Sequence, residues 1–306
     1  MTLAATTEVP AAGQAAGGAG QAAGGAGQAA GGAGQAAGGA GAAGGSPDGD
    51  AAGGRPGRNR VTAAAEIVAA AGPDGTTRLP VLASQVPLVL RRTPSGVYLV
   101  GGAAGPIGGD QLSLRITVGP GAFLRVCSAA ASIALPGLDG LESVLRVSVT
   151  VAAGGRLEYL PEPLVVTAGA RHATVVSVAL EAGASLLLRD EVLLGRHGEA
   201  GGAVRSVLRA DYAGRPLLRH SVEVAGDDPV SRGPALLAGH RGVGALLAAG
   251  PDAAGTLAAG PLTVGPLTAG ASPEVAVMPL AGPGVLVTAL ADDAVTLRRR
   301  LGRFRG

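Results

Sequence analysis

Strict alternation between apolar and polar residues is the feature that most constrains the fold of this chain. In residues 111–118 (QLSLRITV), aliphatic side chains alternate with Ser, Arg and Thr, and residues 144–151 (VLRVSVTV) repeat the pattern. Successive side chains of a strand point to opposite faces, so a period of two is typical of half-buried strands. The chain is therefore predicted to be mainly β.

Glycine turns divide these apolar runs at intervals of about thirty residues. The turns are GPGA at 119–122, AAGG at 152–155 and EAGA at 181–184, and each joins two apolar runs. Such recurrence suits stacked layers or a solenoid in which each coil covers its neighbour. We expect a layered or β-helix-like scaffold of antiparallel strands.

About two short helices are expected beside the strands. Residues 234–250 could form one helix or two, with Pro234 at a permitted first-turn position. Residues 292–304 begin with Asp292 and Asp293 and end in arginines, an order that complements the helix dipole.

The first fifty-seven residues have a different composition. Residues 13–40 are four copies of GQAAGGA, whose side chains are too small to bury enough apolar surface to offset the entropy of ordering. We expect a disordered low-complexity arm over residues 1–57 and a single β-rich domain over residues 58–306.

Charge and composition exclude several classes of protein. The net charge of +2 is too small to indicate a nucleic-acid partner. A single cysteine, Cys127, excludes an internal disulfide and a multi-cysteine zinc site. The N-terminus does not resemble a signal peptide, and the longest uncharged stretch, residues 253–273, is interrupted by Gly and Pro. We expect a cytoplasmic protein without a membrane segment.

Motifs for catalysis are absent. The histidines do not have the HxH or HExxH spacing that places two imidazoles on one metal ion. The chain also lacks a phosphate-binding GxxxxGK[ST] loop and a GxSxG nucleophile motif. These observations disfavour an enzyme.

Residues 157–166 (LEYLPEPLVV) form the first of two charged segments. Glu158 and Glu162 lie an even number of positions apart, so both point to one face if the chain is extended. Pro161 and Pro163 cannot donate to a strand ladder. The residues alone favour an edge strand protected by proline and charge.

The second charged segment is residues 188–200 (LRDEVLLGRHGEA). Asp190 and Glu191 point to opposite faces of a strand, so one carboxylate faces the packed side and needs a partner there. Two interpretations stay open, namely salt bridges to Arg189 or Arg196, or a hydrated polar passage or binding rim.

Four blocks of the sequence, in order, resemble the UreD (also called UreH) family of urease accessory proteins. The blocks are residues 108–126, with a Gly-Asp before an alternating strand, residues 154–166, with Leu-Glu-Tyr-Leu-Pro, residues 181–200, with an acidic pair and a Gly-Arg-x-Gly-Glu turn, and residues 211–224. The resemblance covers about two-thirds of the chain. It departs at residues 127–137, where many relatives carry a polar run that includes lysine.

The resemblance implies a non-enzymatic scaffold that works with UreF and UreG to insert nickel into apo-urease. GTP hydrolysis in such a complex belongs to UreG, which agrees with the missing phosphate-binding loop. Nickel would pass through the interior as a transient ion. Carboxylates and solitary imidazoles suit such passage, because a closed tetrahedral site would retain the ion.

The resemblance also implies site residues. Those expected to meet nickel in transit are Glu158, Glu162, Asp190, Glu191, His197 and Glu199. The family motifs also contain residues that we expect to support partner binding, namely Asp110, Tyr159, Pro161, Gly195 and Arg196.

Two other functions compete with this interpretation. A β-helix-like scaffold for another metallocentre, of the iron–sulfur assembly type, would share the glycine-turned β layers. A cupin-like metalloenzyme would need two or three clustered histidines, which the spacing does not supply.

Overall fold

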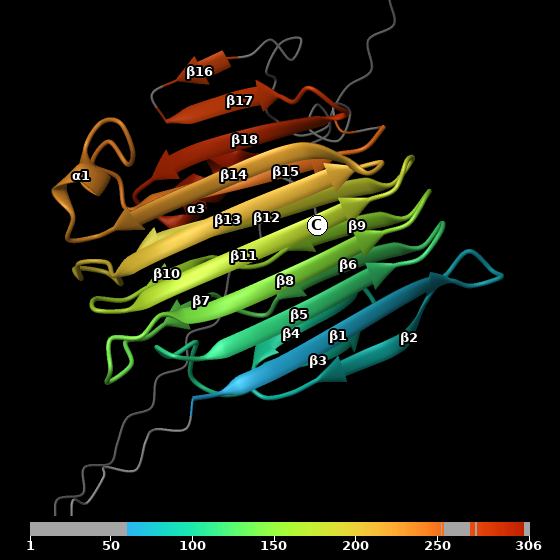
Figure 1. The fold of residues 1–306 in the computed structure, drawn as a ribbon, viewed down its shortest axis with the longest axis horizontal. Coiled ribbons are helices and arrows are strands. Elements are labelled where there is room, and N and C mark those ends of the chain that lie inside the picture. Colours follow the sequence, from blue (N-terminus) through green and yellow to red (C-terminus); the bar gives the residue numbers. More distant parts are fainter. Residues whose placement is uncertain (1–59, 252, 254–269, 273, 303–306) are drawn as a thin grey trace, which may run out of the picture. The chain divides into compact units, whose positions relative to one another are not determined.

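A computed structural model of the 306-residue chain describes residues 60–251, 253, 270–272 and 274–302. The arm predicted for residues 1–57 lies outside the described residues. The described residues form two facing β-sheets (Figure 1).

Sheet A has seven strands. In spatial order they are β14 (Arg215–Ala225), β13 (Ala203–Tyr212), β11 (Arg171–Leu180), β8 (Ser143–Val151), β5 (Gln111–Val118), β1 (Thr62–Ala71) and β2 (Thr77–Ser84).

Sheet B has eleven strands. Nine follow in the order β16 (Gly270–Ser272), β17 (Val275–Pro279), β18 (Gly284–Ala291), β15 (Gly242–Ala249), β12 (Ser185–Leu194), β9 (Arg156–Leu160), β6 (Phe123–Ser128), β4 (Gly96–Gly101) and β3 (Leu88–Thr93). Two short strands, β7 (Ser132–Ala134) and β10 (Leu164–Val166), pair with each other, and β10 also pairs with β12.

The centre of the fold is a β-solenoid of about four coils. The chain passes from β5 in sheet A to β6 in sheet B, then from β8 to β9 and from β11 to β12. Each strand pairs in parallel with the strand one coil later, as β5 does with β8 and β8 with β11. The prediction of a mainly β, β-helix-like scaffold is confirmed.

The predicted antiparallel pairing is wrong for these central coils. Each glycine turn carries the chain across to the facing sheet instead of back along the same sheet, so consecutive strands do not pair with each other. Antiparallel pairs occur at the flanks, between β1 and β2, β3 and β4, β13 and β14, and from β12 outward through β15, β18 and β17 to β16.

The three glycine turns stack as one corner of the solenoid. Gly121, Gly154 and Gly183 have φ angles of 65°, 70° and 81°, a conformation that glycine adopts without the steric cost of a side chain. A Cβ atom on Gly154 would lie 3.7 Å from the nitrogen of Gly121, and one on Gly183 would lie 3.8 Å from the nitrogen of Gly154. The three turns therefore lie directly over one another along this corner.

The main core lies between the sheets and is aliphatic. The alternating residues of 111–118 place Leu112, Leu114, Ile116 and Val118 inside, as their period predicts. Full burial of one such side chain contributes about 1.5–3 kcal/mol to stability relative to exposure. Aliphatic side chains thus hold the two sheets together and leave little room for polar groups between them.

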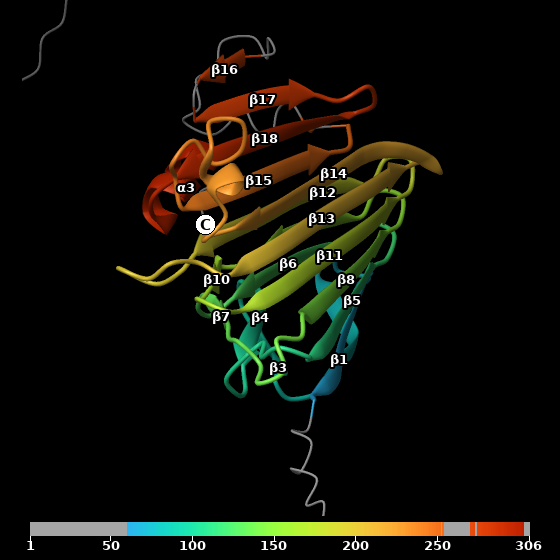
Figure 2. The ribbon, with the colours of Figure 1, turned by 60° about the vertical axis from the view of Figure 1, so that its left-hand side comes forward.

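The C-terminal helix α3 (Ala294–Leu301) confirms the helix predicted over residues 292–304. Its N-cap, Asp293, accepts a hydrogen bond from Thr296 N at 2.8 Å. Fully buried Leu297 and Leu301 pack with side chains of β15 and β18 in a second apolar cluster. The helix lies beside these two strands of sheet B (Figure 2). No helix in the described part of the chain is long and apolar enough to cross a bilayer.

The helix predicted over residues 234–250 is wrong, because residues 242–249 form strand β15. Its side chains serve two cores alternately, with Ala245 and Leu247 in the intersheet core and Leu246 and Ala248 in the cluster under α3. Burial on both faces removed the alternation that would have indicated a strand. A second short helix does occur just before this segment, as α1 (Pro229–Arg232).

Candidate functional site: a charged window in sheet B

Sheet B is interrupted where β9 ends and β10 begins. Strand β12 pairs with β9 through residues 185–188 and with β10 through residues 192–194. On this side, residues 189–191 lie opposite the Pro-Glu-Pro segment 161–163, which contributes no ladder, since proline has no N–H to donate. We call this interruption, formed by residues 161–163 and 189–191, the sheet window.

The edge-strand interpretation of residues 157–166 is therefore wrong. Strand β9 lies between β6 and β12 in the middle of sheet B, paired on both sides. The prolines end the pairing along the strand and do not protect an edge. Their effect is to interrupt the strand ladder at one place in the wall of the solenoid.

A cavity of about 460 Å³ adjoins the window. Its interior wall carries Tyr159, His172 and Thr174, and its lining also includes the window residues Glu162, Arg189, Asp190 and Glu191. A second cavity, of about 240 Å³, is lined by apolar side chains together with Asp190, Ser206 and His220. Asp190 borders both cavities.

Asp190 points inward to the facing sheet. Its Oδ2 accepts a short hydrogen bond from Ser206 Oγ on β13. Burial raises the pKa of Asp190, while the bond from Ser206 and the nearby His220 oppose this rise. Burial also raises the pKa of Tyr159 and lowers the pKa of His220. A carboxylate is thus held in a largely apolar interior with a single hydroxyl bond, an arrangement that favours attraction of a cation.

His172 is a buried polar residue that the sequence did not indicate as a site. Its Nδ1 lies 2.8 Å from Ser143 Oγ, and its Nε2 lies 3.2 Å from Thr174 Oγ1. Burial lowers the pKa of His172 to about 4, so the imidazole is neutral at pH 7. The only sequence signal was a histidine at the start of an apolar strand, which is equally typical of a surface residue.

Glu191 points outward, so the predicted opposite orientation of the acidic pair is confirmed. Its side chain is completely buried, and Arg298 of α3 donates to its Oε2 at 2.8 Å. Arg189 Nε lies 3.2 Å from the same oxygen, which confirms one of the predicted salt bridges. Arg298 also donates to Glu162 Oε1 at 3.0 Å, and Arg189 donates to the carbonyl of Pro161 at 2.9 Å.

Glu158 lies beside this network on the same sheet and is almost completely buried. Its two oxygens accept from Arg125 Nε at 2.6 Å and from Arg156 Nη2 at 2.7 Å. The carboxylate is thus paired across neighbouring strands β6 and β9. This pairing gives Glu158 a role in holding the wall next to the window.

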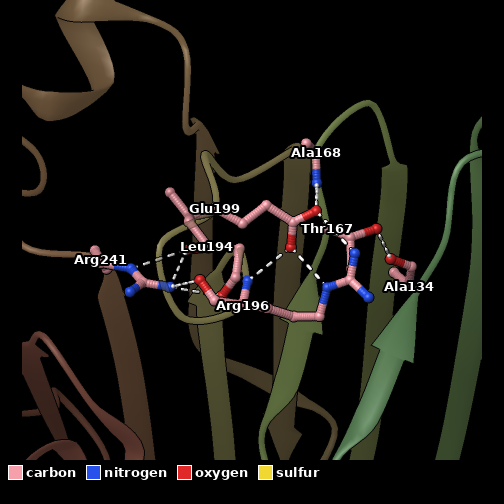
Figure 3. A network of polar contacts seen from close by, with 8 residues as sticks. Ala134, Thr167, Ala168, Leu194, Arg196, Glu199 and Arg241 are labelled. Carbon is pink, nitrogen blue, oxygen red and sulfur yellow. Dashed lines mark hydrogen bonds and ion pairs between the residues drawn. The ribbon is translucent and has the colours of Figure 1, made fainter.

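The turn after β12 is held by a second polar network (Figure 3). Glu199 Oε2 accepts hydrogen bonds from Arg196 N at 2.9 Å and Arg196 Nε at 2.8 Å. Its Oε1 accepts from Arg196 Nη2 at 3.1 Å and from the amide of Ala168 at 3.3 Å. The hydrogen bonds from Arg196 lower the pKa of Glu199 to about 2. Arg241 donates to the carbonyls of this turn, and Gly195 adopts a φ of 73° within it.

The other predicted residues take different places. Asp110 is buried and joins two loops, since its Oδ1 accepts from Val61 N at 3.1 Å and its Oδ2 from Ile107 N at 2.9 Å. His197 is exposed on the turn between Arg196 and Glu199. In the described residues, no group of three or more His, Cys, Asp or Glu side chains is arranged to hold a metal ion.

The fold and the site together define a β-solenoid scaffold in which charged side chains occupy an interruption of one sheet. Residues 61–306 match the model of the family described as UreD urease accessory protein. The chain belongs to this family, and it is accordingly a non-catalytic accessory protein of urease maturation.

Curated relatives agree in sequence along most of their length. A urease accessory protein UreD of Frankia casuarinae is 42% identical, with 81% of this chain and 89% of the relative aligned. One of Frankia alni is 44% identical, with 81% and 93% aligned. Urease accessory protein UreD 3 of Streptomyces griseus is 45% identical, with 76% and 91% aligned.

Proposed function

We propose that this chain conducts nickel ions through the space between its two sheets during maturation of urease. Its family takes part in nickel delivery to urease. The observation that carries the proposal is that two cavities share a single inward carboxylate, Asp190, beside the interruption of the strand ladder. An ion could move along such a series of weak contacts without being retained.

Three of the carboxylates predicted to meet nickel line the larger cavity, namely Asp190, Glu162 and Glu191. We propose them as the contacts of the path. Glu158 and Glu199 have both oxygens engaged by hydrogen bonds, so we propose that they hold the walls. His197 stays a proposed contact outside the cavity mouth.

We further propose that the chain acts in the cytoplasm within a complex with UreF, UreG and apo-urease. Family membership supports these partners. Exposed Arg196 borders the larger cavity and is the proposed contact for a partner there. Asp110, Tyr159, Pro161 and Gly195 would support such contacts indirectly, by fixing the loops and strands around the cavity.

Deletion of the gene tests the proposal most directly. We expect the deletion strain to accumulate urease polypeptide with little nickel and little activity, and the restored gene to recover both. Urease is quantified by immunoblot, so that a loss of activity is not mistaken for a loss of enzyme. Full activity and full nickel content in the deletion strain would eliminate the proposal.

A further inference from the structure

The guanidinium of Arg298 lies between two carboxylates of the sheet window. Its Nη1 is 3.0 Å from Glu162 Oε1, and its Nη2 is 2.8 Å from Glu191 Oε2. Arg298 belongs to α3 and follows Glu191 by 107 residues. A positive charge supplied by a separate element therefore stands where two carboxylates converge.

The hydrogen bonding of this group is incomplete. The side chain of Glu191 is 0% exposed, and its Oε1 has no hydrogen-bond partner among the described residues. The Nε atoms of Arg189 and Arg298 are buried without one as well, again within the described part of the chain. A buried carboxylate oxygen without a donor is costly, so a network that served only to fasten α3 is expected to satisfy it.

The residues that carry these carboxylates also border the larger cavity. Glu162 and Glu191 belong to the lining of the larger cavity, together with Asp190. The cavity therefore adjoins the window from the interior, while α3 lies against the outer face of sheet B. The window thus has an ion path on one side and a helix on the other.

The attachment of α3 is limited in extent. The helix has eight residues and packs through Leu297 and Leu301 over two glycines of β15, Gly242 and Gly244. Helices of this length are marginal in isolation and depend on such packing. Displacement of α3 would break these contacts and free Arg298 from the window without interrupting any strand pairing.

We propose that Glu162 and Glu191 form a divalent-cation site that Arg298 fills while α3 is docked, so that α3 is a displaceable plug of the sheet window. The inference rests on the proposed function. Carboxylate oxygens bind divalent cations. Arg189 balances only one of the two negative charges, since it lies 3.2 Å from Glu191 and 3.8 Å from Glu162, so the added charge of Arg298 neutralises the pair and opposes entry of a divalent ion. Binding of the ion and docking of Arg298 are then mutually exclusive.

Calorimetric titration of the full-length chain with nickel chloride tests the exclusion. We expect Arg298→Gln to bind nickel about tenfold more tightly than the unaltered chain, because the competing charge is gone. The gain should disappear when Glu191→Gln is added. Arg299→Gln is the matched control, since Arg299 is the exposed neighbour on the same helix, and its affinity should be unchanged.

A second measurement uses the unaltered chain, because removal of one partner of a buried ion pair can unfold the helix. We expect saturating nickel to increase amide hydrogen exchange in residues 294–301 and to leave exchange in β15 unchanged. Unaltered exchange in α3 at nickel saturation, or equal affinities of folded Arg298→Gln and the unaltered chain, would overturn the plug. Both measurements omit urease, so they are independent of the deletion strain that tests the proposed function.

Discussion

Replacement of Asp190 by asparagine separates conduction of an ion from stability of the fold. The amide has nearly the shape of the carboxylate, and its oxygen can still accept the hydrogen bond from Ser206. The bond changes from charge-assisted to neutral, at a cost of about 1 kcal/mol. Because the pKa of Asp190 is raised by burial, the charged carboxyl opposes folding at neutral pH and stops doing so below its ordinary pKa of 3.8.

Loss of the charge removes the burial penalty that raises this pKa, and this gain opposes the cost of the weakened hydrogen bond. We expect the unfolding free energy of Asp190→Asn at pH 7 to lie within about 1 kcal/mol of the unaltered chain. For a domain of this size the melting temperature should change by no more than about 4 °C.

The effect on nickel should be much larger. A unit charge about 4 Å from a divalent ion, at an effective dielectric constant of about 20, contributes roughly 8 kcal/mol of attraction, most of which desolvation cancels. If about 1.4 kcal/mol of this attraction remains, the affinity of the site for nickel changes tenfold. We expect urease purified from a strain carrying only Asp190→Asn to contain about one-tenth of the normal nickel, as measured by plasma mass spectrometry.

Asp211→Asn is the control, because Asp211 makes an outer-face salt bridge with Arg219 and borders neither cavity. It should leave nickel content unchanged. A folded Asp190→Asn variant that supports normal nickel loading would show that the ion does not use this carboxylate. A variant that fails to fold would refute the energetic reasoning.

Three further predictions follow from the described contacts. Burial lowers the pKa of His172 from 6.5 to about 4, so the free energy of unfolding should fall by up to about 3 kcal/mol as the pH drops from about 6.5 to 4. Urea unfolding of His172→Gln should not show this dependence on pH. Glu199→Ala should speed amide exchange in residues 195–202 while leaving the global unfolding midpoint unchanged, and unchanged exchange there would contradict the turn network. Leu301→Ala should lower the unfolding free energy by about 2–5 kcal/mol, whereas an unchanged midpoint would show that α3 is not packed as described.

The sequence predicted the strands better than their pairing. The alternation in residues 111–118 and 144–151 predicts half-buried strands, because one face of each strand packs against the core. The glycine turns between runs do not reveal whether the next strand returns in the same sheet or crosses to the other, since both need a residue with positive φ. Parallel coils were therefore not separable from antiparallel layers by local pattern.

The site was only partly predictable for a similar reason. The opposite orientation of Asp190 and Glu191 follows from the geometry of any strand. The partners of those carboxylates do not, because Ser206 lies on the facing sheet and Arg298 on a helix more than a hundred residues later. The effect of the Pro-Glu-Pro segment likewise depended on whether β9 lay at an edge or in the middle of a sheet.

Chain order also has a consequence for synthesis. Glu162 and Glu191 precede Arg298 by 136 and 107 residues. At elongation rates of about 5–20 residues per second, the two acidic side chains leave the ribosome roughly 5 to 27 seconds before Arg298. A growing chain therefore passes through a period in which Arg189 alone faces the two negative charges and one of them is uncompensated, so that a cation present in the cell can occupy the position before α3 exists.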